Sequence, residues 1–333
     1  MKILMFGWEF PPHIAGGLGT ACFGLTKGMM KQGMDVIFVV PKAYGDESQE
    51  AVRLVNASDM AVDLRYAKLT EYWKQLTFME VGSNLIPYVG EDEYYTMLNE
   101  QEKETEYHEG SIYKRKYRFS GKYGKNLMDE VARYAIVAGA IAKNETFNVI
   151  HAHDWLTYPA GIAAKQCSGK PLVVHVHATE FDRSGLNTNS VVYDIERSGM
   201  EAADLVVTVS NLTRQIVIEK YGINPDKVVT VHNAVEPTLD HEREEYSKQI
   251  DRKVVTFLGR VTYQKGPEYF VEAAHKVLQR DPDVHFVLAG DGDMMPKVIR
   301  RVAQLHIGHR FHFTGFLRGK EVDKMFALSD VYV

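Results

Sequence analysis

The chain has 333 residues, enough for two domains of ordinary size or one large α/β domain. Hydrophobic residues make up 45% and charged residues 25%, which excludes a disordered or collagen-like chain. The formal net charge of −5 and the absence of a Lys/Arg run argue against nucleic acid and anionic membranes as partners, so a small molecule or a neutral polymer fits better.

Cysteine content and the first residues indicate the compartment. Cys22 and Cys167 are too few for a disulfide framework and are not spaced as a metal pair. The apolar start "MKILMF" meets Glu9 and two prolines before it reaches the length of a signal-peptide core. No segment approaches the roughly 20 apolar residues of a membrane span. We expect a cytoplasmic protein without a stable membrane anchor.

Short apolar, β-branched runs alternate with helical patterns in the first part of the chain, which is typical of βαβ units. We expect strands at residues 2–6, 35–40, 148–152, 172–177, 205–210 and 228–232. We expect helices at residues 18–32, 127–144, 159–166, 192–202 and 212–221. Because the strands are continuously apolar, they predict a parallel sheet covered on both faces.

Two stretches interrupt this alternation. The region from about 60 to 124 contains the acidic, tyrosine-rich patch "EDEYYTMLNEQEKETEYHEG" and is interpreted as a solvated insertion. Residues 236–252 are polar, include a proline and lack apolar periodicity, so they are interpreted as a linker. The predicted domains are therefore 1–235 and 253–333.

A second α/β series follows the linker. We expect strands at residues 254–258, 284–289 and 311–314, and helices at 267–279, 294–305 and 319–328. The final "DVYV" opens a further strand. Three strands and three helices make about half of a doubly wound domain, so this domain is predicted to be partial.

A glycine-rich turn joins the first strand to the first helix, in "WEFPPHIAGGLGTA". Such a turn presents free backbone N–H groups and the positive end of the helix dipole, which suits a diphosphate. "GGLG" is neither the G-x-G-x-x-G fingerprint nor a P-loop. A tight turn that only packs the helix on the strand is an equally good interpretation.

Four histidines lie at the ends of two neighbouring strands. "VIHAHDWLTY" carries His151, His153 and Asp154, and "VVHVHATEFDRSG" carries His175 and His177. Strand side chains alternate, so each pair points one way, at the edge where open α/β sheets bind ligands. A metal site, hydrogen bonds to a polyhydroxylated ligand and burial in the core all stay open, and the ligand is favoured.

Charged and polar residues follow several other strands. Arg260 and Lys265 come after one strand and before a helix, where two cations suit a leaving phosphate. Asp291 and Asp293 are expected to cap the helix that follows them rather than to hold a divalent metal. Further polar residues close two strands of the first domain, and of these we single out Ser210 and Asn233.

Six motifs in order, "FPPHIAGGLG", "HAHDW", "TVSNLT", "HNAVE", "GRVTYQKG" and "LAGDGD", resemble those of retaining GT-B glycosyltransferases of the glycogen and starch synthase type and their bacterial group 1 relatives. The resemblance covers nearly all of the chain outside the insertion. It implies an α/β fold of two facing Rossmann-like domains with parallel sheets. The acceptor would bind mainly to the first domain and the sugar nucleotide mainly to the second.

The resemblance also implies residue roles. Arg260 and Lys265 would neutralise the departing diphosphate, and His153 would contact the transferred sugar. The donor diphosphate would also face the segment Gly16, Gly17, Leu18 and Gly19. The acceptor and sugar cleft would include His151, Asp154, His177, Glu180, Arg183, Ser210 and Asn233. No cofactor and no metal are expected, because the two cations replace a metal.

The implied reaction moves a glucosyl or other hexosyl unit from UDP-glucose or ADP-glucose to an α-glucan. Two departures from the family pattern bear on this prediction. Bacterial synthases have K-x-G-G-L, whereas this chain has His13, Ile14 and Ala15 before its glycines, which weakens the ADP-glucose assignment. The family's paired glutamates and closing helix would follow Val333, so the sequence predicts a fragment.

Two alternatives remain at this point. One is a group 1 transferase that builds a surface polysaccharide, a glycolipid or a small glycoside. The other belongs to a different class, a non-catalytic module that binds a sugar or a nucleotide.

Overall fold

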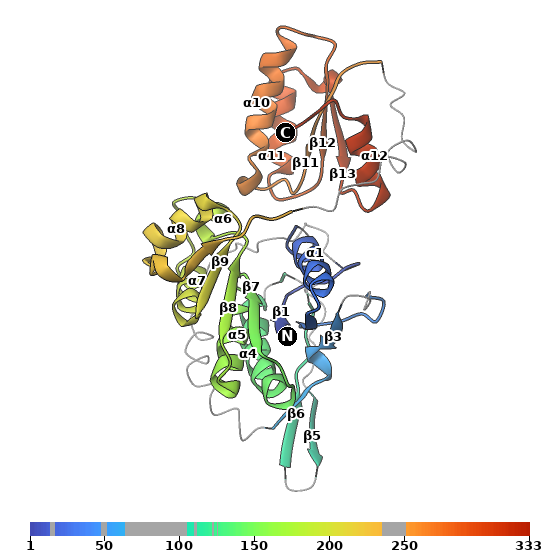
Figure 1. The fold of residues 1–333 in the computed structure, drawn as a ribbon. Coiled ribbons are helices and arrows are strands. Elements are labelled where there is room, and N and C mark those ends of the chain that lie inside the picture. The colour runs from blue at the N-terminus through green and yellow to red at the C-terminus, as the bar shows by residue number, and fades with distance from the viewer. Residues whose placement is uncertain are drawn as a thin grey trace. The chain divides into compact units, whose positions relative to one another are not determined.

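The computed structural model describes residues 1–13, 17–47, 52–63, 105–109, 112–121, 123–124, 126–234 and 251–333. These residues fall into two compact units, one that includes the described residues up to 234 and one that includes those from 251 onward (Figure 1). The predicted linker lies outside the described residues except for its last two, and most of the predicted insertion also lies outside them.

A seven-stranded sheet forms the centre of the first unit, in the order β10-β9-β8-β7-β1-β2-β3 with every pairing parallel. Its strands are β1 (Lys2–Phe6), β2 (Asp35–Val40), β3 (Arg53–Asn56), β7 (Val149–His153), β8 (Leu172–Val176), β9 (Leu205–Thr208) and β10 (Val228–Thr230). The six predicted strands are confirmed within two residues at each end. The edge strand β3 was not predicted, because it is short and its residues are only partly buried or exposed.

Helices pack on both faces of this sheet. They are α1 (Gly17–Lys31), α4 (Leu127–Asn144), α5 (Tyr158–Ser168), α6 (Glu180–Ser184), α7 (Ser190–Ala202) and α8 (Asn211–Tyr221). Cys22 of α1 is buried with Met5 and Phe38 of the sheet. On the opposite face α5 comes so close that a Cβ at Gly161 would lie 3.0 Å from the Cβ of Ala152. The prediction of a parallel sheet covered on both faces is confirmed.

Helix α6 was not predicted, because it has only five residues and no apolar periodicity. A capping box starts it. The N–H of Asp182 donates a hydrogen bond to the hydroxyl oxygen of Thr179, and the Asp182 carboxylate accepts one from the N–H of Thr179 at 2.7 Å. The predicted helices of this unit are confirmed within two residues at each end.

Part of the predicted insertion forms a small antiparallel sheet in the order β4-β6-β5. Its strands are β4 (Ala61–Asp63), β5 (Thr105–Glu109) and β6 (Ile112–Lys116).

The second unit has a four-stranded parallel sheet in the order β13-β12-β11-β14. Its strands are β11 (Val254–Leu258), β12 (His285–Ala289), β13 (Phe311–Gly315) and β14 (Val331–Tyr332). Its helices are α10 (Pro267–Leu278), α11 (Met295–Gln304) and α12 (Lys320–Leu328). The predicted elements are confirmed within one residue, including the strand opened by "DVYV". Four buried phenylalanines from β11, α10, β12 and β13 form much of the core.

The expected helix cap at Asp291 and Asp293 was wrong. The residue before α11 is Met294, and no side chain caps the helix. The Asp291 carboxylate instead accepts a bond from the N–H of Gly292 at 2.7 Å. The two glycines in "GDGD" serve close backbone contact, because a Cβ at Gly290 would lie 1.8 Å from the carbonyl oxygen of Gly259.

None of the helices in the described part of the chain combines the length and the apolar character that crossing a bilayer requires.

Candidate functional site

The carboxyl edge of the first unit's sheet gathers the residues that were predicted to form a site. Five adjacent strands, β10, β9, β8, β7 and β1, are parallel and therefore end on the same edge. The segments that follow them carry Asn233, Ser210, His177, Asp154 and Gly17. The sheet order thus brings together residues that are distant in the sequence.

His151, His153, His175 and His177 form one histidine stack on the face of the sheet that also carries Met5. Register pairs His153 with His175 and Met5 with His151. Ring centroids are 4.4 Å apart for His151 and His153 and 4.3 Å apart for His175 and His177, with interplanar angles of 26° and 21°. His153 Nδ1 and His177 Nε2 are hydrogen-bonded at 3.0 Å.

Several ring nitrogens of the stack are buried without a partner among the described residues. They are Nε2 of His151, Nε2 of His153 and both nitrogens of His175. Buried polar groups in proteins are nearly always bonded, so these atoms indicate a place for water or a ligand. Ligand nitrogens of three of these rings lie within 4.8 Å of one another.

All four histidines of the stack are held in the neutral form. Burial lowers the pKa of His175 to about 3 and that of His177 to about 4. Burial, together with the neighbouring imidazoles, also lowers the pKa values of His151 and His153 well below their usual range. A neutral imidazole has one donor and one acceptor nitrogen, and a hydroxyl group also both donates and accepts, so the stack suits a ligand rich in hydroxyls.

Asp154 fixes the ends of β7 and β8 relative to each other. Its backbone has a positive φ of 57°, which an aspartate tolerates better than most residues. Its N–H donates to the carbonyl of His175 at 3.0 Å, and its carboxylate accepts from the N–H of His177 at 2.7 Å. Burial raises the pKa of Asp154 to about 6, although the nearby charge of Arg183 opposes this. Its predicted contact with a substrate stays a prediction.

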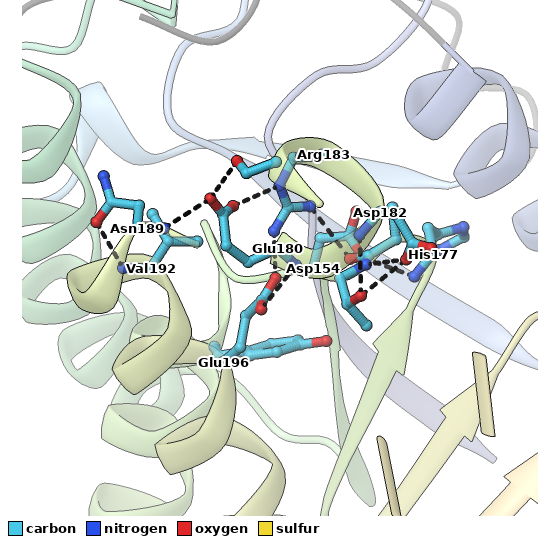
Figure 2. Close-up of polar contacts among 12 residues, drawn as sticks. Asp154, His177, Glu180, Asp182, Arg183, Asn189, Val192 and Glu196 are labelled. Atoms are coloured by element: carbon cyan, nitrogen blue, oxygen red, sulfur yellow. Dashed lines mark hydrogen bonds and ion pairs between the residues drawn. The ribbon is translucent and has the colours of Figure 1, made fainter. Parts of the chain in front are cut away.

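Arg183 is the centre of a buried polar network that includes Glu180 and Glu196 (Figure 2). Its Nε donates to a carboxylate oxygen of Glu180 at 3.1 Å, and its Nη1 donates to the carbonyl of Ala178 at 3.1 Å. Its Nη2 forms an ion pair with Glu196, which also contacts the hydroxyl of Tyr221. The prediction that Glu180 and Arg183 line the acceptor side is untested, and in this structure their charged groups are bonded within the protein.

Sequence analysis did not identify Glu196. It lies on α7, 13 residues beyond Arg183, and nothing in its local pattern separates it from a solvent-exposed helical glutamate. The fold buries it, leaving 3% of its surface exposed. Burial raises the pKa of Glu196 to about 7, against the opposing effects of Arg183 and Tyr221.

The other polar residues at this edge have simpler surroundings. The Ser210 hydroxyl caps α8 by accepting a bond from the N–H of Thr213 at 3.0 Å. Asn233 is exposed.

The glycine-rich segment begins α1. Gly17 is exposed, and a Cβ there would meet no atom of the described residues within 4 Å. The N–H of Gly19 donates to the buried carboxylate of Glu9 at 3.3 Å, an interaction that sequence analysis missed. Leu18 packs against the apolar core. Gly16, the remaining member of the predicted diphosphate segment, lies outside the described residues.

The second unit brings its two predicted cations into one short segment between β11 and α10. Arg260 is half-buried, and Lys265 is exposed at the end of a turn of 3₁₀ helix, Tyr263–Lys265. Gly266 follows in the left-handed conformation with φ 61°, and Pro267 is the first residue of α10. Lys265 therefore lies just before the N-terminus of α10, where an anion is favoured, and Arg260 precedes it in the same segment.

A groove of about 510 Å³ lies near the amino ends of β1, β7 and β8. Its lining is mostly apolar and includes Met29, Met34 and Val173, with His151 at one side. Because it offers little chemistry, we place the candidate site at the carboxyl edge instead.

Known proteins share this organisation. Residues 2–231 match the family described as starch synthase catalytic domain, and residues 240–333 match glycosyl transferases group 1. An uncharacterized glycosyltransferase of Methanocaldococcus jannaschii is 28% identical over 346 aligned residues, which cover 100% of this chain and 74% of that protein. A glycogen synthase of Mycobacterium tuberculosis is 22% identical, with 100% and 72% covered.

The likeness extends to solved structures. The crystal structure of Anabaena Alr3699/HepE in complex with UDP and glucose matches with a TM-score of 0.61 and 15% identity, covering 100% of this chain and 73% of that chain. At this identity the match shows the fold, which is the α/β GT-B class with parallel sheets, as predicted. Over its first unit the chain belongs to the starch synthase catalytic domain family and over its second to the group 1 glycosyltransferases, and it is a glycosyltransferase.

Proposed function

We propose that the protein transfers a glucosyl unit from a nucleoside-diphosphate sugar to an α-glucan, with retention of configuration. The observation that carries the proposal is the neutral, buried histidine stack, in which Nε2 of His151, Nε2 of His153 and both nitrogens of His175 lack partners within the described residues. A sugar supplies a dense set of hydroxyls that both donate and accept, which is what such a row of imidazoles can bind.

In the proposed reaction, the bond from the sugar's anomeric carbon to the diphosphate breaks, and a bond from that carbon to an acceptor hydroxyl forms on the same face. The acceptor proton passes to an oxygen of the leaving phosphate. Arg260 and Lys265 stabilise the charge that develops on the diphosphate, and no metal or further cofactor is needed for this role. His153 contacts the transferred sugar, and its position supplies orientation rather than charge.

UDP-glucose is the donor that we favour. His13 lies near the place where bacterial synthases have a lysine before the glycines. It does not replace that lysine, because its side chain is already in contact with other residues. Its Nε2 is paired with Asp46 at 2.6 Å, and its ring lies 4.1 Å from that of Tyr44. The HepE structure was solved with UDP and glucose, which supports a uridine donor.

The test is to incubate the purified chain with UDP-glucose, ADP-glucose or GDP-mannose, with and without glycogen, and to measure released nucleoside diphosphate. Glycogen-dependent release from UDP-glucose is expected. Release of nucleoside diphosphate that does not depend on glycogen but does depend on another saccharide would contradict the glucan acceptor and favour the group 1 alternative. Nucleotide binding without release from any pair would contradict the transferase activity of this chain and favour the binding module.

A further inference from the structure

The turn after β8 carries His177 and is fixed at both ends by buried carboxylates. At its start, the carboxylate of Asp154, the residue after β7, accepts a hydrogen bond from the N–H of His177 at 2.7 Å. A few residues later, the N–H of Glu180 donates to a carboxylate oxygen of Glu196 at 3.0 Å (Figure 2). The backbone between these two points therefore has little freedom.

Arg183 adds a second link between Glu196 and the same turn. Its guanidinium pairs with Glu196 on one side and donates to the carbonyl of Ala178 at 3.1 Å on the other. Both charged side chains are at least nine-tenths buried, because 9% of the side-chain surface of Arg183 and 4% of that of Glu196 is exposed. Loss of Glu196 would remove one of the two carboxylates that pair with the buried Arg183 guanidinium, and such a loss is costly for a charge that water does not solvate.

Glu196 is itself held from a third direction. The hydroxyl of Tyr221 on α8 contacts the oxygen that also accepts from Glu180. Glu196 thus receives three donors from three places, α8, Arg183 and the backbone of the turn. It is not a member of the histidine stack, and its bond to the N–H of Glu180 links it to the turn that carries His177.

The far end of this chain of contacts is the histidine stack. His177 is bonded to His153 at 3.0 Å, and His153 is the residue proposed to contact the transferred sugar. A shift of residues 177–180 would move His177 relative to His153. Displacements near 1 Å at a reacting group can reduce rates by about 100-fold.

We propose that Glu196 is a positioning residue for sugar transfer, which holds residues 177–180 through Arg183 and the N–H of Glu180 and so keeps His177 in register with His153. The inference rests on the proposed function for its catalytic consequence. Its structural part, the fixed turn, does not depend on that function.

The variant is Glu196→Gln, which keeps the size of the side chain but replaces one carboxylate oxygen with an amide nitrogen that cannot accept a hydrogen bond. We expect kcat to fall roughly 10- to 100-fold, the range typical for mutation of a residue that orients a side chain in contact with the bound group. The KM for UDP-glucose should change less than about twofold, because Arg260 and Lys265 are unchanged. The matched control is Glu201→Gln on the same helix, whose partner Arg197 is exposed. It should leave both constants unchanged.

A double-mutant cycle separates positioning from loss of stability. If Glu196 acts through His177, Glu196→Gln should have little further effect on kcat in a His177→Ala background. Equal effects in both backgrounds would overturn the proposal, because a general loss of folded protein would act regardless of His177.

Hydrogen exchange of the peptide that covers residues 177–184 gives a readout that needs no turnover. Glu196→Gln should speed exchange there, and Glu201→Gln should not. If Glu196→Gln fails to fold, Tyr221→Phe removes only one of the three donors and should give a smaller increase in the same peptide. Unchanged exchange would overturn the proposal. Faster exchange in a chain that transfers no sugar would instead uphold the fixed turn and reject the proposed function.

Discussion

His175 lies inside the histidine stack, with neither ring nitrogen bonded to any described residue and with 5% of its surface exposed. Its pKa of about 3 in the folded protein lies far below the usual 6.5, so the unfolded chain takes up a proton first as the pH falls. The stability contributed by this neutral ring is fully present above pH 6.5 and is lost progressively between that pH and about 3. His177 acts in the same direction.

We therefore expect His175→Gln to be less sensitive to acid than the wild type. Between pH 7 and pH 5 the wild type should lose on the order of 2 kcal/mol more unfolding free energy than the variant, since one pKa unit corresponds to about 1.4 kcal/mol. Guanidinium unfolding at the two pH values measures this difference. Parallel losses in both proteins would show that His175 takes up its proton in the folded state.

Lys265 is exposed, so its removal should affect chemistry and not folding. If it binds the leaving diphosphate, Lys265→Ala should lower turnover by roughly 10- to 100-fold, since a charge-assisted bond contributes about 1.5 to 3 kcal/mol. The control is Lys276→Ala, an exposed lysine further along α10. Equal turnover in the two variants, measured as nucleoside diphosphate release, would remove Lys265 from the mechanism.

The residue types of the site could be predicted from the sequence, but not all of their partners. His151, His153, His175 and His177 could be predicted to share one face, because side chains alternate along a strand. Glu196 could not be predicted, since its contacts with Arg183 and Tyr221 depend on how α7 and α8 pack. The same applies to Glu9, which is ten residues from Gly19 and meets it only after the chain turns.

At the scale of elements, the end of β12 packs backbone to backbone against the segment after β11. Gly290 has φ 146°, and a Cβ there would lie 1.8 Å from the carbonyl oxygen of Gly259. Gly292 is similarly close to the carbonyl of Val261, at 2.5 Å. This contact fixes the backbone directly beside Arg260.

Gly290→Ala should therefore destabilise the second unit by more than the roughly 1 to 3 kcal/mol that an unfavourable backbone conformation costs alone. Gly308→Ala is the control, because a Cβ at Gly308 would meet nothing within 4 Å. Thermal melting compares them. A melting temperature for Gly290→Ala equal to that of the control would mean that the two segments can separate without cost.

Element boundaries were predicted well where burial is complete. The central strands of the first unit are buried on both faces, so their apolar runs stand out in the sequence. Strand β3 and helix α6 were missed for a shared reason. Each is short, and each depends on a neighbour or a capping box rather than on its own pattern.

For the molecule as a whole, a ligand that binds only the folded protein must raise its stability. At a concentration 100-fold above its dissociation constant, UDP should add about 2.7 kcal/mol. We expect UDP to raise the melting temperature of the wild type and to have little effect on Arg260→Ala. An equal increase in both would place the nucleotide away from Arg260, and a larger increase with ADP than with UDP would contradict the favoured donor.

The fold class was predictable because two α/β series and their motifs occur in a familiar order. The strand order β10-β9-β8-β7-β1-β2-β3 was not, since it depends on which crossovers the helices make. That order places the segments after five strands along one edge. The domain limits at 235 and 253 stay predictions.

The bond between His153 Nδ1 and His177 Nε2 holds a single proton. If His153 donates, its Nε2 is left as an acceptor and His177 carries its own proton on Nδ1. If His177 donates, both outer nitrogens exchange these roles. The pair therefore has two tautomeric states. In one state a given outer nitrogen donates to a ligand hydroxyl, and in the other it accepts from one, with no movement of a heavy atom.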